Sequence, residues 1–143
     1  MATIGHAKWT GGLRSGEGVI NTGSGAVTGQ KYTAASRFSG DKGTNPEELL
    51  GAAHASCFTM ALTLFLESAG HEPEGVETTA TVTLKQDSGG YTISKINLET
   101  VGTVPGISEE DFQEQAKNAK EQCPVSRALA SVPEVTLDAK LAG

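Results

Sequence analysis

The sequence predicts an α+β fold with mainly antiparallel sheets and one long buried helix. The predicted order is strands, a buried helix, a long hairpin, a helix and a closing strand, which differs from the regular alternation of a doubly wound parallel fold. Residues 46–69 form a mostly apolar run. Residues 76–85 alternate with a period of two and lead through a turn into another strand-like segment.

The first third of the chain is β-rich. Residues 3–39 contain short strand-like pieces separated by the turn signals Asn-Thr-Gly, Ser-Gly and Thr-Gly. Arg37 lies in the piece "AASRF", which we assign to a strand. A loop at residues 40–45, "GDKGTN", ends this region.

The central helix has start and stop signals at both ends. Asn45 is a good N-cap, Pro46 suits the first helical position, and Glu48 completes a capping-box pattern. Gly70 is the expected C-cap. Because the middle of the helix is apolar on nearly every side, we expect it to be buried on most sides.

The second half predicts a hairpin, two helices and a strand. Residues 76–85 and 91–106 form the hairpin, and the helix that follows has Ser108 as its N-cap. A short helix begins at Pro124, and residues 134–142 form the closing strand. We expect one domain over all 143 residues.

Charge and composition exclude several functions. A net charge of −6 disfavours nucleic acid and anionic membranes as partners. The N-terminus lacks a basic start followed by an apolar run, and polar residues interrupt the apolar stretch at 49–66. We therefore expect a soluble, cytoplasmic protein that neither spans a membrane nor binds nucleic acid.

The two cysteines, Cys57 and Cys123, are either inert core residues or a redox pair. A thiol in apolar surroundings has a raised pKa and reacts only where a nearby cation favours the thiolate. Cys123 precedes Pro124 at the start of a short helix, where free N–H groups favour a negative sulfur. Their separation of 66 residues leaves contact between them to the fold.

Three other residues have both a structural and a chemical interpretation. His54 lies one turn before Cys57, but a zinc site needs three or four ligands, so we expect a hydrogen-bonded helix residue and no metal. Glu47 suits the first turn of a helix. Arg37 keeps its charge and offers two parallel donors, so it is suited to lie between a carboxylate and a thiolate.

The stretch "RFSGDKGTNPEELLGAAHASCFTMAL", with "EQCPVSRAL" downstream, resembles the OsmC/Ohr family of thiol-dependent peroxidases, and most of all its OsmC branch. The similarity extends to "AKWTGGL" near the start and to the closing "EVTLDAKL". It implies an intertwined homodimer with two sites at the interface. It also implies that Cys57 is the peroxidatic cysteine, Cys123 the resolving cysteine, Arg37 the residue that stabilises the thiolate, and Glu47 the partner of that arginine.

The resemblance also implies a reaction without metal or bound cofactor. The Cys57 thiolate attacks an organic hydroperoxide or hydrogen peroxide and becomes a sulfenic acid. Cys123 then forms a disulfide with Cys57, and a dithiol such as a lipoyl group restores both thiols. Glu47 lies ten residues before Cys57, about 15 Å along a helix, so either Arg37 bridges them or the two residues come from different subunits. We favour an arginine bridge at or near the dimer interface.

Two alternatives remain open at this stage. The chain is a non-catalytic module that holds a small apolar ligand in a dimer cleft, or it is a peroxide sensor that uses the same cysteine pair. Turnover of hydroperoxide with a dithiol distinguishes the enzyme from both.

Overall fold

The computed structural model describes residues 1–142, and these form two compact units that divide between Leu49 and Leu50. The single domain expected over residues 1–143 stays a prediction.

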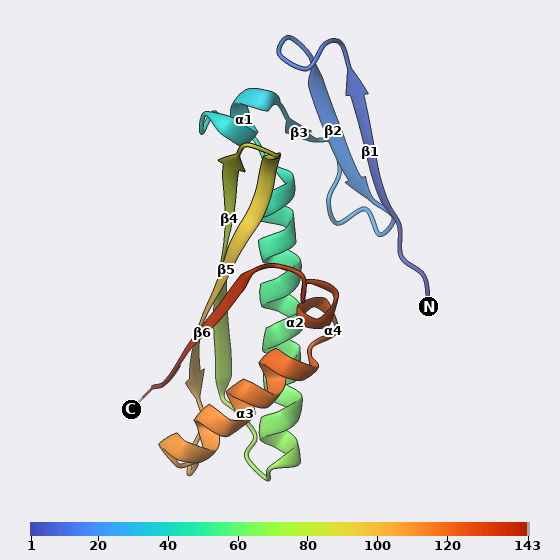
Figure 1. The fold of residues 1–143 in the computed structure, drawn as a ribbon. Helices are drawn as coiled ribbons and strands as arrows, with labels where there is room; N and C mark the ends of the chain where they lie inside the picture. The colour runs from blue at the N-terminus through green and yellow to red at the C-terminus, as the bar shows by residue number, and fades with distance from the viewer. Residues whose placement is uncertain (143) are drawn as a thin grey trace. The chain divides into compact units, whose positions relative to one another are not determined.

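The first unit contains a three-stranded antiparallel sheet (Figure 1). Its strands are β1 (Gly5–Thr10), β2 (Glu17–Thr22) and β3 (Gln30–Tyr32), in the order β1-β2-β3. The β-rich character expected for this region is therefore confirmed.

Arg37 lies in a short helix, α1 (Ala34–Phe38), so its assignment to a strand was wrong. A capping box explains the helix: the Thr33 hydroxyl accepts from the Ser36 N–H at 2.9 Å, and the Ser36 hydroxyl accepts from the Thr33 N–H at 2.9 Å. The Ser36 hydroxyl also lies 2.9 Å from the Thr44 carbonyl oxygen, to which it can donate. Side-chain capping of this kind favours a helix where the apolar pattern alone is too short to identify one.

Helix α2 (Pro46–Ser68) has nearly the predicted bounds. The Asn45 side-chain oxygen accepts from the Glu48 N–H at 2.8 Å, as an N-cap does. The Glu48 carboxylate accepts from the Thr44 hydroxyl at 2.8 Å, so this contact replaces the second half of the expected capping box. Gly70, with φ of 89°, ends the helix in the left-handed conformation that favours glycine.

The second sheet contains β4 (Gly75–Asp87), β5 (Gly90–Thr103) and β6 (Glu134–Leu141), in the order β4-β5-β6. The predicted hairpin β4–β5 is antiparallel, whereas β6 pairs with β5 in parallel. The parallel pairing follows from the long connection through α3 (Glu109–Gln122) and α4 (Pro124–Ala128), because parallel neighbours need a crossover.

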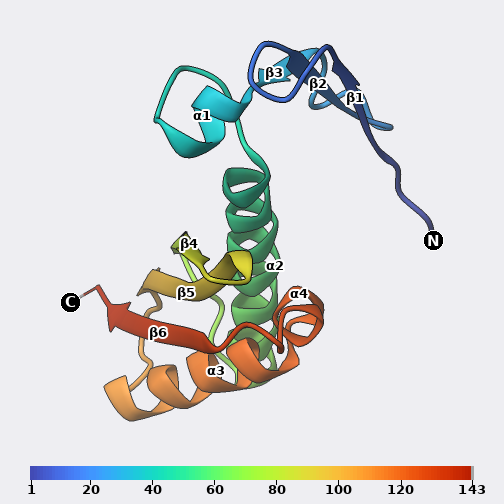
Figure 2. The ribbon, with the colours of Figure 1, turned by 45° about the horizontal axis from the view of Figure 1, so that its top comes forward.

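Two helices cover one face of this sheet, as Figures 1 and 2 show for α2 and α3. The core combines Phe58, Leu62 and Leu66 of α2 with Ile96 and Leu98 of β5, all 0% exposed. Phe112 of α3 packs on Gly102 of β5, where an added Cβ would lie 2.5 Å from the ring. This arrangement fixes the direction of α3, which leads directly to Cys123.

The other side of α2 is exposed in a single chain. Met60 is 75% exposed and Leu64 is 60% exposed, while Phe58 and Leu62 are buried. By length and composition α2 could cross a membrane, with a mean hydropathy of 1.7 despite its polar interruptions and with 28% of that window buried. Core helices of soluble proteins pass the same test, and the Phe58 side of α2 belongs to the core of the second unit.

Candidate active site

The fold brings the two cysteines together within the second unit. Cys57 is half-buried in the middle of α2, and Cys123 is fully buried between α3 and α4. The Cys123 N–H donates to the Ala119 carbonyl at 2.9 Å, so the end of α3 fixes its backbone. Both thiols are free, and they lie close enough for each to shift the pKa of the other. Residues 66 positions apart thus form a pair from which a disulfide can develop.

The surroundings shift the pKa values of the two thiols in opposite directions. Burial raises the pKa of the Cys57 thiol, and its hydrogen bond to Cys123 raises this pKa further, although the Val125 N–H opposes both. Burial also raises the pKa of Cys123, but hydrogen bonds from Cys57, Ser126 and Val125 outweigh it, so the net pKa of Cys123 lies below its usual value. Within this unit the negative charge is therefore more stable on Cys123, as its position before Pro124 predicted.

His54 is a hydrogen-bonded helix residue, as predicted. It is 0% exposed, and its Nε2 lies 2.7 Å from the Ser126 hydroxyl of α4. Burial lowers the pKa of the imidazole, so the ring is neutral at pH 7. This hydrogen bond joins α2 to α4 next to the cysteine pair.

Ser126 is the residue at this site that sequence reasoning missed. Its hydroxyl lies 2.7 Å from His54 Nε2, and its side chain lowers the pKa of the Cys123 thiol. The available signal was its position three residues after Cys123, at the start of a helix that begins with Pro124. One helical turn of that spacing places a side chain beside the residue that precedes the helix.

Arg37 and Glu47 form a two-pronged ion pair in the first unit. Arg37 Nη2 lies 2.6 Å from Glu47 Oε1, and Nε lies 3.2 Å from Oε2. The Glu47 side chain is 10% exposed and the Arg37 side chain 35% exposed. The Arg37 guanidinium also stacks on Phe38, 5.3 Å from the ring centroid. The predicted partnership of these two residues is present, while contact between Arg37 and Cys57 stays a prediction.

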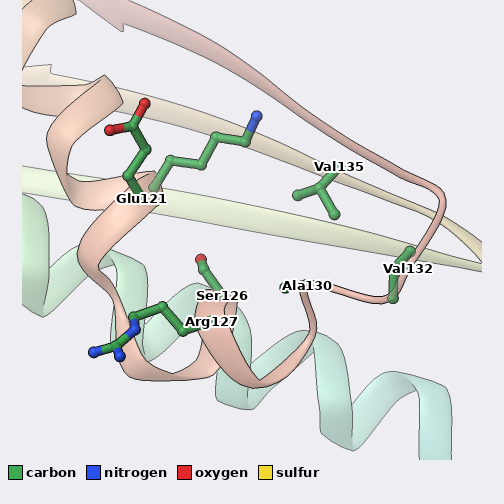
Figure 3. A pocket seen from close by; sticks show the side chains of 7 residues that line it. Glu121, Ser126, Arg127, Ala130, Val132 and Val135 are labelled. Atoms are coloured by element: carbon green, nitrogen blue, oxygen red, sulfur yellow. The ribbon is translucent and has the colours of Figure 1, made fainter.

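A pocket of about 320 Å³ lies beside the cysteine pair, between the end of α3, α4 and the start of β6 (Figure 3). Ser126 and Arg127 line it together with Val132 and Val135. Within the described residues, neither cysteine is part of its lining. The pocket therefore gives access to Ser126.

A family model described as "OsmC-like protein" matches residues 39–138, well over half of the chain. The chain belongs to the OsmC-like protein family. The matched region includes both cysteines and Glu47. The resemblance identified from the sequence motifs is thereby confirmed.

Individual relatives agree with this family. The OsmC-like chain is 47% identical to Peroxiredoxin OsmC of Escherichia coli (strain K12), over 96% of this chain and 94% of that protein. It is 35% identical to Organic hydroperoxide resistance protein OhrA of Bacillus subtilis (strain 168), over 68% of each chain.

Its fold is similar to the crystal structure of the organic hydroperoxide resistance protein OhrB of Bacillus subtilis. The TM-score is 0.68 and the identity 28%, and the match covers 97% of this chain and 98% of that one. The predicted α+β, OsmC/Ohr-like fold is therefore confirmed.

Proposed function

We propose that this OsmC-like protein is a cysteine-based peroxidase that reduces organic hydroperoxides and hydrogen peroxide. The observation that carries the proposal is the pair of free, neighbouring thiols of Cys57 and Cys123, held by α2 and by the α3–α4 junction. The names of its relatives, a peroxiredoxin and organic hydroperoxide resistance proteins, support the same chemistry.

The reaction needs only thiol chemistry. The Cys57 thiolate attacks the peroxide, the O–O bond breaks, and the departing alkoxide takes a proton to leave as an alcohol. The resulting sulfenic acid at Cys57 reacts with the Cys123 thiolate, a disulfide forms, and the released hydroxide becomes water. A dithiol, such as a lipoyl group, then takes the oxidising equivalents and restores both thiols.

Arg37 and Glu47 complete the proposed site. The guanidinium moves the negative charge from Cys123 to Cys57 when it lies near that sulfur, because an adjacent cation lowers a thiol pKa. Glu47 holds the guanidinium with two hydrogen bonds, at 2.6 and 3.2 Å, and so limits its directions of approach. Neither residue needs a metal or a bound cofactor for this role.

We also propose that one domain of residues 1–143 pairs as a homodimer in the cytoplasm. The exposed Met60 and Leu64 on α2 support an apolar interface, because large side chains of this kind are usually covered. Light scattering should then give twice the 14.7 kDa mass of one chain. A monomer at all concentrations would contradict the pairing.

Turnover measurements test the proposed activity. Purified protein with cumene hydroperoxide and a dithiol should consume peroxide continuously, and Cys57→Ser should lose all turnover. Cys123→Ser should reduce one equivalent and then stop with a sulfenic acid at Cys57, which mass spectrometry detects as one added oxygen. Binding of an apolar ligand without turnover would instead indicate a binding module. A single oxidation with very slow re-reduction would indicate a sensor.

A further inference from the structure

His54 and Ser126 form a second set of contacts around the cysteine pair. His54 lies on α2 one turn before Cys57, and Ser126 lies on α4 one turn after Cys123. The 2.7 Å hydrogen bond between them therefore spans the same two elements as the sulfur pair. The proposed reaction of the cysteines does not by itself account for this arrangement.

The burial of His54 determines where its proton lies. Among residues 1–142, no atom hydrogen-bonds to Nδ1 of His54, which is fully buried. A buried N–H without an acceptor is rarer in proteins than a buried acceptor without a donor. We therefore assign the proton of the neutral ring to Nε2, which donates to the Ser126 oxygen.

This proton position orients the Ser126 hydroxyl. A serine has one hydrogen to donate, and with His54 as the donor that hydrogen is not used toward the ring. It is free to point at the sulfur of Cys123, the N-cap residue one turn earlier, whose pKa the Ser126 side chain lowers. The opposite tautomer would draw the serine hydrogen to His54 and leave the sulfur with a lone pair facing it.

We propose that His54 and Ser126 are positioning residues for the second step of the reaction, and that they aim a hydroxyl hydrogen at the sulfur of Cys123. This proposal rests on the proposed peroxidase function. Before the step, the hydroxyl stabilises the thiolate of Cys123. As the sulfur–sulfur bond forms and the sulfur–oxygen bond of the Cys57 sulfenic acid breaks, the charge passes to hydroxide, and the proton given up by Cys123 balances the one that hydroxide takes up as water.

The expected size of the effect follows from thiol reactivity. Raising a thiol pKa by one unit lowers the thiolate fraction about tenfold at pH 7, but the nucleophilicity of that thiolate rises about threefold. Loss of the Ser126 hydroxyl should therefore slow disulfide formation about threefold at pH 7 for each unit by which the pKa rises. At a pH above the Cys123 pKa of both proteins, where the thiol is ionised in either case, the slowing should disappear or reverse.

Other titratable groups near Cys123 set the background of that pH profile. Those on the elements around it are Cys57 and His54 on α2, Lys120 and Glu121 at the end of α3, Arg127 on α4, and Glu134 at the start of β6. Glu134 pairs with Lys95 at 2.7 Å. All of them are retained in the variants below except His54 and, in the absorbance measurement, Cys57, which is replaced in every protein compared there, so a difference between variants reports on the His54–Ser126 contact.

Rapid mixing of the reduced protein with one equivalent of cumene hydroperoxide separates the two steps. Dimedone trapping follows the sulfenic acid, and mass spectrometry follows the disulfide. Ser126→Ala should lengthen the lifetime of the sulfenic acid at pH 7, and Ser126→Thr should restore it because the hydroxyl remains. Ser131→Ala, at an exposed serine after α4, is the matched control and should resemble the unchanged protein.

A double-mutant cycle tests the role of His54. His54→Phe should slow disulfide formation like Ser126→Ala, whereas His54→Gln, with an amide N–H near the position of Nε2, should slow it less. Because His54 acts through Ser126, the double variant His54→Phe/Ser126→Ala should be no slower than Ser126→Ala alone. Additive effects, or equal sulfenic acid lifetimes in Ser126→Ala and Ser131→Ala, would overturn the proposal.

A measurement without peroxide keeps this proposal separate from the proposed function. In the Cys57→Ser background, the ultraviolet absorbance of the thiolate reports the ionisation of Cys123 directly. Adding Ser126→Ala should shift its midpoint to higher pH, and adding Ser126→Thr should not. If the unchanged protein formed no sulfenic acid with peroxide while this shift appeared, the peroxidase function would fail and the orientation of Ser126 would stand.

Discussion

The Arg37–Glu47 pair and the cysteine pair differ in the groups that stabilise a negative charge. In the first these groups are charged, and in the second they are neutral. Around Arg37 two full charges neutralise each other through a two-pronged contact, with the carboxylate almost fully buried. Around the cysteines, within the second unit, the partners in contact are neutral: a thiol, a hydroxyl, an imidazole and backbone N–H groups.

This difference explains why the pKa values of Cys57 and Cys123 are shifted in opposite directions. Neutral donors suffice to lower the pKa of Cys123, which has several of them, whereas the pKa of Cys57 is raised by burial and by its bond to Cys123. For Cys57 to react first, a full positive charge has to be added. In the proposed function Arg37 supplies such a charge, and the comparison predicts that its removal affects Cys57 far more than Cys123.

Removing the Arg37 guanidinium is the most direct test of this comparison and should have the largest effect. Arg37→Ala should raise the pKa of Cys57 and slow its reaction with peroxide about 100-fold, the usual loss for a missing charge-stabilising donor. Alkylation rate against pH measures the pKa, and rapid mixing with peroxide measures the rate. Arg37→Lys should fall between, because lysine keeps the charge without the planar fork.

Arg14→Ala is the control for that experiment, since Arg14 is exposed. An alkylation midpoint of Cys57 that does not move in Arg37→Ala would mean that the two regions work independently. Arg37 would then have no part in the chemistry.

Removing the negative charge of Glu47 tests the same comparison and should slow the peroxide step less than removing Arg37 does. Glu47→Gln should slow the peroxide step about tenfold, or 1.4 kcal/mol of barrier, because the guanidinium keeps its charge but loses a charged partner. Glu48→Gln is the matched control, being the adjacent and exposed glutamate. Equal rates in the two variants would assign to Glu47 only the structural role of a first-turn acid.

Lowering the pH tests whether the cysteine site favours a neutral His54. The expected effect, on the free energy of unfolding, is the smallest of the three. The folded-state pKa of His54 lies below its unfolded value of about 6.5, because burial disfavours the imidazolium. The unfolded chain therefore binds the proton first as pH falls, so the stabilisation present above pH 6.5 is lost below it. The loss is at most about 1.4 kcal/mol per pH unit.

Urea unfolding between pH 7.5 and 5, at one protein concentration, measures this loss. The slope should be reduced in His54→Gln and unchanged in His6→Gln, where the histidine is exposed. Equal slopes in all three proteins would show that His54 takes up its proton as readily in the folded protein as in the unfolded chain.

Most of the fold could be predicted from local patterns. The caps Asn45, Gly70 and Ser108 fixed the ends of two helices, and the period of two located the hairpin. The strand assigned to Arg37 was wrong because five residues carry too little periodicity to oppose the Thr33–Ser36 capping box. Parallel pairing of β6 was not predicted, since the pattern within one strand does not specify its partner.

Part of the candidate site could also be predicted from the sequence, and part could not. The roles of Cys57, Cys123, Arg37 and Glu47 came from the resemblance to a family, and the chemistry of each residue type agreed with them. Ser126 was missed because its two contacts depend on the packing of α4 against α2, over a separation of 72 residues from His54. A serine in a short helix has an ordinary capping or surface interpretation until the tertiary contact is known.

The parallel pairing of β6 with β5 has a consequence for synthesis. Cys123 lies in the connection between these strands, at the end of α3, so it is made after β5 and before the strand that completes the sheet. During translation, Cys57 leaves the ribosome well before that strand does. The emerging chain therefore carries an unpartnered thiol at Cys57 until the crossover that contains Cys123 has been made.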